Sequence, residues 1–359
     1  MSARTEPRLL AGRGRQRGLS IVELMVSIVV AMLVGLAAAG SAIVFTAQQR
    51  QGIGIGGAGV GAETALSALK NDAALAGLGF FGDTNYLCQN LAMSVDAAVV
   101  VDGTPFVPMR ITAEATDDRV DIVYADRIES GANVLMKTVP TATTAELMSL
   151  LPVVPGQAVL LAPASGAGTC VVRTITGVTA STVDTPQILT FDNVAGARFN
   201  QAAFSVAPTF AERDRVALLG DVQWNRYRRI GNTLVMERPM DGTSAVLARN
   251  VIGLRAQYGI AAAAAGSTTL ETWQAATGGF AALSAATLPR VRAIRFGIVT
   301  RSPQREKENS AGVCEASAAK PQLWGATVEP DVVDWQCYRY SVQTVVVPMR
   351  NVVLGLNKT

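Results

Sequence analysis

The chain has 359 residues, and 49% of them are apolar, which is enough to build a core and argues against a disordered chain. It contains no histidine, so histidine-based catalytic triads and histidine metal sites are excluded. The formal net charge is +3, but residues 1–18 alone carry +4. The remaining chain is therefore close to neutral, at −1, and offers no broad electrostatic surface for nucleic acid.

A basic leader precedes a long apolar stretch near the amino terminus. The leader ends with Arg13, Arg15, Arg17 and Gly18. From Leu19 to about Gln51 the sequence predicts one helix, and its apolar part, 24–45, is long enough to cross a bilayer. The helix carries one early acid, Glu23. Since a carboxylate costs about 2.5–3.5 kcal/mol at the centre of a membrane helix and less near the interface, we expect Glu23 to have a functional partner.

These arginines, Gly18, Glu23 and the apolar run together resemble the class III signal of type IV pilins and pseudopilins. The resemblance implies that a dedicated prepilin peptidase cleaves after Gly18 and that the new terminus, Leu19, is methylated. It also implies that Glu23 of one subunit pairs with the Leu19 amine of its neighbour inside a fibre. Leucine at the mature start departs from the usual phenylalanine.

A different cleavage site is also present in the helix. Ala37–Ala39 followed by Gly40 satisfies the A-x-A rule of ordinary signal peptidase. Cleavage there would release a soluble periplasmic protein and discard Glu23.

Residues 52–61 contain six glycines, which we expect to break or loosen the helix and to act as a flexible joint. The run formally matches G-x-G-x-x-G twice, but a dinucleotide site must follow a strand, and here a membrane helix precedes it. A second helical segment is predicted over 62–79. Its Leu66, Leu69 and Ala73 share one face, which we expect to dock on the globular domain.

From residue 80 to 359 the sequence predicts a β-rich head. Apolar and alternating runs, punctuated by Gly, Pro, Ser and Thr, predict strands at 96–101, 118–125, 157–162, 169–176, 187–191, 215–220, 221–230, 233–239, 251–260, 291–301 and 341–350. The expected fold class is α+β, with a long amino-terminal transmembrane or spine helix followed by an antiparallel β-rich head. Its parts are the leader at 1–18, the helix at 19–51, the joint at 52–61, the second helical segment at 62–79 and the head at 80–359.

Three later stretches are similar to PilW-like minor pilins and to J-type pseudopilins of type II secretion. They are NDAALAGLGFFG at 71–82, LARNVIGLRAQYG at 247–259 and PRVRAIRFGIVTRSP at 289–303. The first resembles a D-x-R-x-A-G-[YF]-x-G motif, with Ala74 in place of the arginine. The second implies a short helix that leads into a strand.

Two sets of polar residues are candidate binding sites. Asp117, Asp118 and Asp121 cluster near one strand, and Asp331 and Asp334 flank Trp335, but no calcium-loop motif is present, so charged turns are favoured. Trp224, Arg226 and Arg228 share one face of a predicted strand, with Tyr227 and Arg229 on the other. Such a surface can bind single-stranded nucleic acid, but a solvated strand is favoured.

The four cysteines, in a chain whose bulk lies outside the inner membrane, indicate disulfides with three possible connectivities. The resemblance to pilins implies a Cys314–Cys337 bridge across the polar segment near the carboxyl end, which leaves Cys88 and Cys170 as the second pair.

No P-loop, G-x-S-x-G, H-E-x-x-H or S-x-x-K motif is present, so we expect no enzymatic activity, no catalytic residues, no cofactor and no metal. The resemblance implies a minor pilin that takes part in pilus assembly. Its expected partners are other minor and major pilins, the prepilin peptidase and the inner-membrane assembly platform, and nucleic acid is not expected. The expected location is the inner membrane with a periplasmic head before assembly, and the pilus afterwards. Alternatives are a type II secretion pseudopilin and a signal-anchored or secreted periplasmic binding protein or hydrolase.

Overall fold

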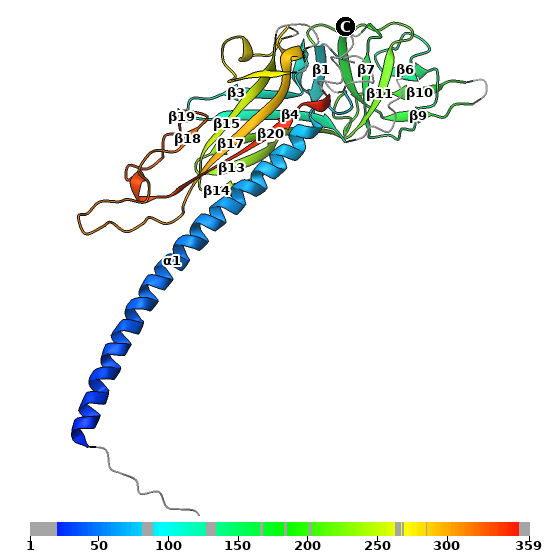
Figure 1. Cartoon of the computed structure of the whole chain (residues 1–359). Helices are drawn as coiled ribbons and strands as arrows, with labels where there is room; N and C mark the ends of the chain where they lie inside the picture. The colour runs from blue at the N-terminus through cyan, green and yellow to red at the C-terminus, as the bar shows by residue number, and fades with distance from the viewer. Residues whose placement is uncertain are drawn as a thin grey trace, which may run out of the picture. The chain divides into compact units, whose positions relative to one another are not determined.

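The computed structural model describes residues 20–80, 88, 90–126, 134–165, 168–182, 185–200, 203–262, 267, 269–284 and 286–351. The chain divides into two compact units, Met1–Ile53 and Gly54–Thr359. A long helix, α1 (Ile21–Leu75), is followed by a series of strands (Figure 1). The expected α+β class, an amino-terminal helix followed by a largely antiparallel β-rich head, is confirmed.

Helix α1 is continuous through the glycine run, so the expected break at residues 52–61 is not present. Each glycine costs about 1 kcal/mol relative to alanine in a helix. The turns that follow the run are buried in the core of the second unit, and such packing commonly outweighs propensity. The boundary between the two units, Ile53/Gly54, nevertheless falls inside this run. Whether it bends as a joint stays a prediction.

Two sheets pack around the last turns of α1. The five-stranded sheet has the order β14 (Thr243–Arg249), β13 (Thr233–Arg238), β12 (Val222–Ile230), β4 (Asp118–Ala125) and β3 (Met109–Ala113). The four-stranded sheet has the order β16 (Leu270–Gln274), β15 (Val251–Ala261), β17 (Val291–Arg301) and β20 (Tyr340–Pro348). Neighbours in both sheets are antiparallel.

The rest of the head is built on a six-stranded sheet. Its order is β2 (Ala98–Pro105), β1 (Asn90–Val95), β8 (Thr169–Thr174), β7 (Ala158–Ala162), β11 (Arg215–Gly220) and β5 (Val134–Leu135), with β1 and β8 parallel. A three-stranded sheet has the order β6 (Thr144–Leu147), β10 (Gln187–Thr190) and β9 (Gly177–Thr179), and it packs against one face of the six-stranded sheet. Its strands are labelled to the right of β7 and β11 in Figure 1. Smaller elements are the hairpin β18 (Gln322–Leu323) and β19 (Ala326–Thr327) and the 3-10 turns Gly278–Phe280, Leu288–Arg290 and Trp335–Cys337.

Two further sequence expectations about local structure are wrong. The strand expected at 96–101 begins at Ala98, because Asp96 and Ala97 have φ values of 45° and 70° and form the turn between β1 and β2. The short helix expected near 247 is the end of strand β14. Asn250, with φ of 57°, then turns the chain into β15, and asparagine tolerates this left-handed conformation.

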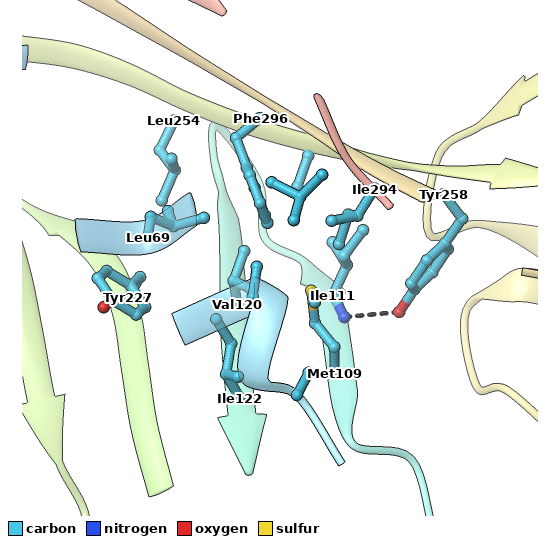
Figure 2. Close-up of a cluster of buried hydrophobic side chains, with 14 of the residues drawn as sticks. Leu69, Met109, Ile111, Val120, Ile122, Tyr227, Leu254, Tyr258, Ile294 and Phe296 are labelled. Carbon is cyan, nitrogen blue, oxygen red and sulfur yellow. Dashed lines mark hydrogen bonds between the residues drawn. The ribbon is translucent and has the colours of Figure 1, made fainter. Parts of the chain in front are cut away.

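The principal core joins α1 to both sheets. Leu66 and Leu69 are buried among apolar side chains of β3, β4, β15 and β17, so the expected docking of this face on the globular domain is present. Figure 2 shows Leu69 and Phe296 within this cluster, and Tyr258 at its edge, where its hydroxyl accepts a hydrogen bond of 2.6 Å from the backbone N–H of Ile111. That bond ties the edge of the five-stranded sheet to the four-stranded sheet.

Candidate functional site

The first part of α1 is an apolar helix that no described residue buries. Ile21–Ala42 has a mean hydropathy of 2.5 and is long and apolar enough, by length and composition, to cross a membrane. Its large apolar side chains from Ile21 to Leu36 are 48–79% exposed. Burying one such side chain is worth about 1.5–3 kcal/mol, so this surface favours lipid or another apolar helix over water.

Glu23 lies in the first turn of this helix and is exposed. The Ser27 hydroxyl donates a hydrogen bond of 2.7 Å to the backbone carbonyl of Glu23, so the Glu23 carboxylate is not engaged by that serine. Across the part of the chain that the structure describes, no cation pairs with this carboxylate. A negative charge at a helix amino terminus is favourable by up to about 1 kcal/mol, which does not offset transfer to hydrocarbon. Gly18 and Leu19 lie outside the described residues.

Gly35 and Gly40 have no side chain and leave open space on the surface of the same helix. A Cβ added at Gly35 or at Gly40 would meet no atom within 4 Å. Small residues of this kind let two membrane helices approach closely. This span can therefore pack against other helices at these positions.

Asp72, near the end of α1, is a site residue that the sequence analysis did not single out by itself. Its Oδ2 accepts hydrogen bonds from the Tyr227 hydroxyl at 2.5 Å and from Asn225 Nδ2 at 2.6 Å, and its Oδ1 accepts one from the Tyr124 hydroxyl at 3.1 Å. Burial is the largest cause and the nearby Asp72 charge the second, and together they raise the pKa of Tyr124 to about 12. The same two causes raise the pKa of Tyr227 by more than they raise that of Tyr124. Asp72 is the aspartate of the 71–82 motif, which is the one signal that marked it.

The acidic cluster at the start of β4, with Asp117 just before the strand, joins the two sheets. Asp117 Oδ1 accepts a hydrogen bond of 2.9 Å from the backbone N–H of Leu254, and Asp118 Oδ2 accepts one of 2.8 Å from that of Ala256. Asp117 also pairs with Arg229 at 2.7 Å. Burial raises the pKa of Asp118. These oxygens already serve protein donors, which supports a structural role over a calcium site.

The second acidic pair is bound to arginines in the same way. Asp331 lies 2.6 Å from Arg301, and Asp334 lies 2.6 Å from Arg305. The hydrogen bond from Arg305 lowers the pKa of Asp334.

The aromatic–arginine strand, β12, has acidic partners along its length. Arg226 Nε lies 2.7 Å from Asp121 Oδ1, and Arg228 lies 2.6 Å from Glu237. Trp224 Nε1 donates a hydrogen bond of 2.9 Å to the same Asp121 oxygen, and the Arg226 guanidinium lies 5.5 Å from the Trp224 ring centre. Tyr227 points to the opposite face, into the core. With these charges paired, the strand offers no row of free cations for a nucleic-acid backbone.

Both disulfides of the sequence expectation are present. Cys314 is bonded to Cys337, and Cys88 is bonded to Cys170. The first encloses the polar segment after β17, and the second joins the chain before β1 to β8.

Two parts of the chain, one near the amino terminus and one in the head, match known protein families. Residues 224–351 match the family described as Type IV Pilus-assembly protein W, and residues 13–39 match the prokaryotic N-terminal methylation motif. A solved type IV-like pilin from Thermus thermophilus is similar at 9% identity with a TM-score of 0.34, covering 82% of this chain and 97% of that one. No curated protein matches the chain. In these two parts, the amino-terminal signal and the carboxyl-terminal part of the head, the chain is similar to PilW-like proteins of the type IV pilin superfamily.

Proposed function

We propose that this protein is a minor pilin that takes part in the assembly or priming of a type IV pilus. The observation that carries the proposal is the exposed apolar helix Ile21–Ala42, which overlaps a methylation motif at 13–39 and is followed by a head with a PilW match at 224–351. In this role prepilin peptidase cleaves after Gly18 and Leu19 is methylated. The head is periplasmic while the helix is stored in the inner membrane, and both enter the fibre on assembly.

Glu23 has a specific part in this proposal. A charge in an apolar fibre core is costly unless it is paired. The amine of Leu19 in a neighbouring subunit is a cation of the right kind, and pairing with Glu23 fixes the axial register of the two helices. The partners reached in this way are other minor and major pilins, and the assembly platform receives the subunit from the membrane.

The type II secretion pseudopilin is the second candidate, because the amino-terminal signal is common to both groups. The family match over residues 224–351 is to a pilus-assembly protein, which favours the pilus.

The first experiment is mass spectrometry of the mature amino terminus, using protein from native membranes and from sheared surface fibres. We expect a chain that begins at Leu19, with or without one added methyl group, in both samples. A chain that begins at Gly40, or one that keeps its leader, would overturn the proposal. Presence of the processed chain in membranes but not in pilus fibres, together with a secretion defect on its deletion, would favour the pseudopilin.

A further inference from the structure

A small cavity lies in the head between two sheets. Its volume is about 200 Å³, and it is lined by β1 and β2 on one side and by β3, β4 and β12 on the other. Leu91, Met93, Phe106 and Val107 line it and are buried, so part of the lining is apolar. The cavity therefore offers an apolar surface to a ligand group of modest size.

Arginines form the polar part of the lining. Arg110, Arg119 and Arg226 all line the cavity, together with Asp121 and Trp224. Asp121 is only 8% exposed and accepts hydrogen bonds from Arg226 Nε at 2.7 Å, Arg119 Nε at 3.2 Å and Trp224 Nε1 at 2.9 Å. This carboxylate holds two guanidinium groups and the indole in place before any ligand arrives.

Some guanidinium N–H groups of these arginines are still available after the hydrogen bonds to Asp121 are made. Arg226 reaches Asp121 through Nε, and its two Nη groups donate no hydrogen bond to any residue the structure describes. Arg110 is exposed and, within the same residues, its side chain donates none either. Arg119 uses its other nitrogens on Thr112, at 3.3 Å, and on Glu114, at 3.5 Å.

The charges around the cavity do not cancel. The three arginines face two acids, Asp121 in the lining and Glu114 beside Arg119, which leaves one positive charge. A planar carboxylate matches the fork of a guanidinium and supplies one negative charge. An apolar or aromatic body attached to it would lie on the apolar lining and beside the Trp224 ring.

We infer that this cavity binds a monoanionic ligand in which a carboxylate is attached to a short apolar or aromatic group, with Arg110 and Arg226 holding the carboxylate. A free organic acid and the carboxyl terminus of a peptide with an apolar last residue share this chemistry. The inference is independent of the role proposed for the apolar helix.

The test uses the full chain in lipid nanodiscs and follows the indole N–H signal of Trp224 by NMR, assigned with the Trp224→Phe variant. One arm titrates 3-phenylpropanoate against its neutral amide. The other titrates a tetrapeptide that ends in phenylalanine with a free carboxyl group against the amidated peptide. We expect a saturable shift with at least one acid, with an affinity at least about tenfold above that of its amide, since hydrogen bonds to charged groups are worth about that much. The arm that binds more tightly identifies the source of the carboxylate.

The variants are Arg110→Ala, Arg226→Lys and, as a matched control, Arg249→Ala, an exposed arginine at the end of β14. Arg110→Ala should weaken acid binding by about tenfold and leave amide binding unchanged. Arg226→Lys keeps a cation beside Asp121 but loses the planar fork, so it should weaken acid binding too. Arg249→Ala should bind as the natural chain does. Equal binding of acid and amide, no Trp224 shift with either acid, or unchanged acid binding in Arg110→Ala would overturn the inference.

Discussion

The Tyr227 hydroxyl donates a hydrogen bond of 2.5 Å to the Asp72 carboxylate, which connects the last turns of α1 to the centre of the five-stranded sheet. Asn225, two residues earlier on β12, donates to the same oxygen. Tyr124 of the adjacent strand β4 donates to the other oxygen. One acceptor thus satisfies three donors from two neighbouring strands, and it fixes the rotation of the helix end on the sheet as well as its position.

Replacing Asp72 by alanine should lower the free energy of unfolding by about 2–4 kcal/mol, because three donors lose their acceptor in a largely buried place. The measurement is denaturant unfolding of the full chain in detergent, followed by circular dichroism. Glu63→Ala is the matched control, since Glu63 is an exposed acid on the same helix, and it should change stability by less than about 0.5 kcal/mol. Equal effects of the two substitutions would show that Asp72 does not anchor the helix.

Alkaline pH should destabilise the head through Tyr124. Its pKa in the folded state is raised from 10.0 to about 12, chiefly by burial and then by Asp72. A tyrosine with a raised folded pKa stabilises the fold below its unfolded pKa, and this contribution is lost as the pH rises through the folded pKa. Melting temperatures should therefore fall between pH 10 and pH 12 more steeply in the natural chain than in Tyr124→Phe. Parallel pH profiles for the two proteins would contradict this assignment.

Asp118→Asn should raise the melting temperature at pH 7. Burial is the largest influence on Asp118 and raises its pKa above 3.8, so the ionised form is disfavoured in the folded state. The asparagine Oδ1 can still accept the Ala256 N–H. The gain should shrink as the pH falls through the raised folded pKa of Asp118, and it should be absent below the unfolded value of 3.8, where the carboxyl group is protonated in both states.

Asp334→Asn is the control, because the pKa shift of Asp334 has the opposite direction to that of Asp118. The hydrogen bond from Arg305 lowers the Asp334 pKa, so the ionised aspartate is favoured in the folded state above pH 4. It should not raise the melting temperature at pH 7. A gain for this variant as large as that for Asp118→Asn would mean that burial of the charge is not the cause.

Removing the two disulfides separately should have unequal effects. Cys88 and Cys170 are 82 residues apart, whereas Cys314 and Cys337 are 23 apart. Closure of the longer loop removes more entropy from the unfolded chain, which gives expected losses of about 4.5 and about 3.4 kcal/mol. The measurement is denaturant unfolding of the two double Cys→Ser variants. A larger loss for the Cys314/Cys337 variant would show that native contacts near that bridge, and not loop length, set its contribution.

Glu23→Gln should leave the subunit processed and stored in the membrane but reduce its recovery in sheared fibres by about tenfold, because the neutral side chain cannot pair with an amine in an apolar core. Immunoblots of membrane and fibre fractions measure the two pools. Glu63→Gln, a substitution of the same type on the same helix, should enter fibres normally. Normal recovery of Glu23→Gln would remove the charge pair from the proposed mechanism.

Much of the fold could be predicted from local pattern. The strands at 118–125, 215–220 and 291–301 have the bounds expected from their apolar runs. Leu66 and Leu69 identified the buried face of the helix because apolar residues at that spacing share one side. Strand β14 was not expected, since an edge strand with four consecutive exposed residues carries no alternating pattern.

The polar contacts of the head could not be predicted in the same way. Asp72 finds its partners 52, 153 and 155 residues further along the chain, and local sequence contains no information about such distant pairs. The cavity beside Trp224 likewise depends on β1 and β2 meeting β12, although Trp224 and Arg226 themselves stood out in the sequence.

The unbroken helix across the glycine run has a mechanical consequence. Ten helical residues span about 15 Å, whereas the same residues fully extended span about 34 Å, so melting of 52–61 would lengthen the connection by about 19 Å. Six glycines make this the segment with the lowest intrinsic helix stability in α1, by about 6 kcal/mol relative to alanine. Under tension it should therefore yield before the buried turns that follow it, and so act as an extensible link that spares the head from unfolding.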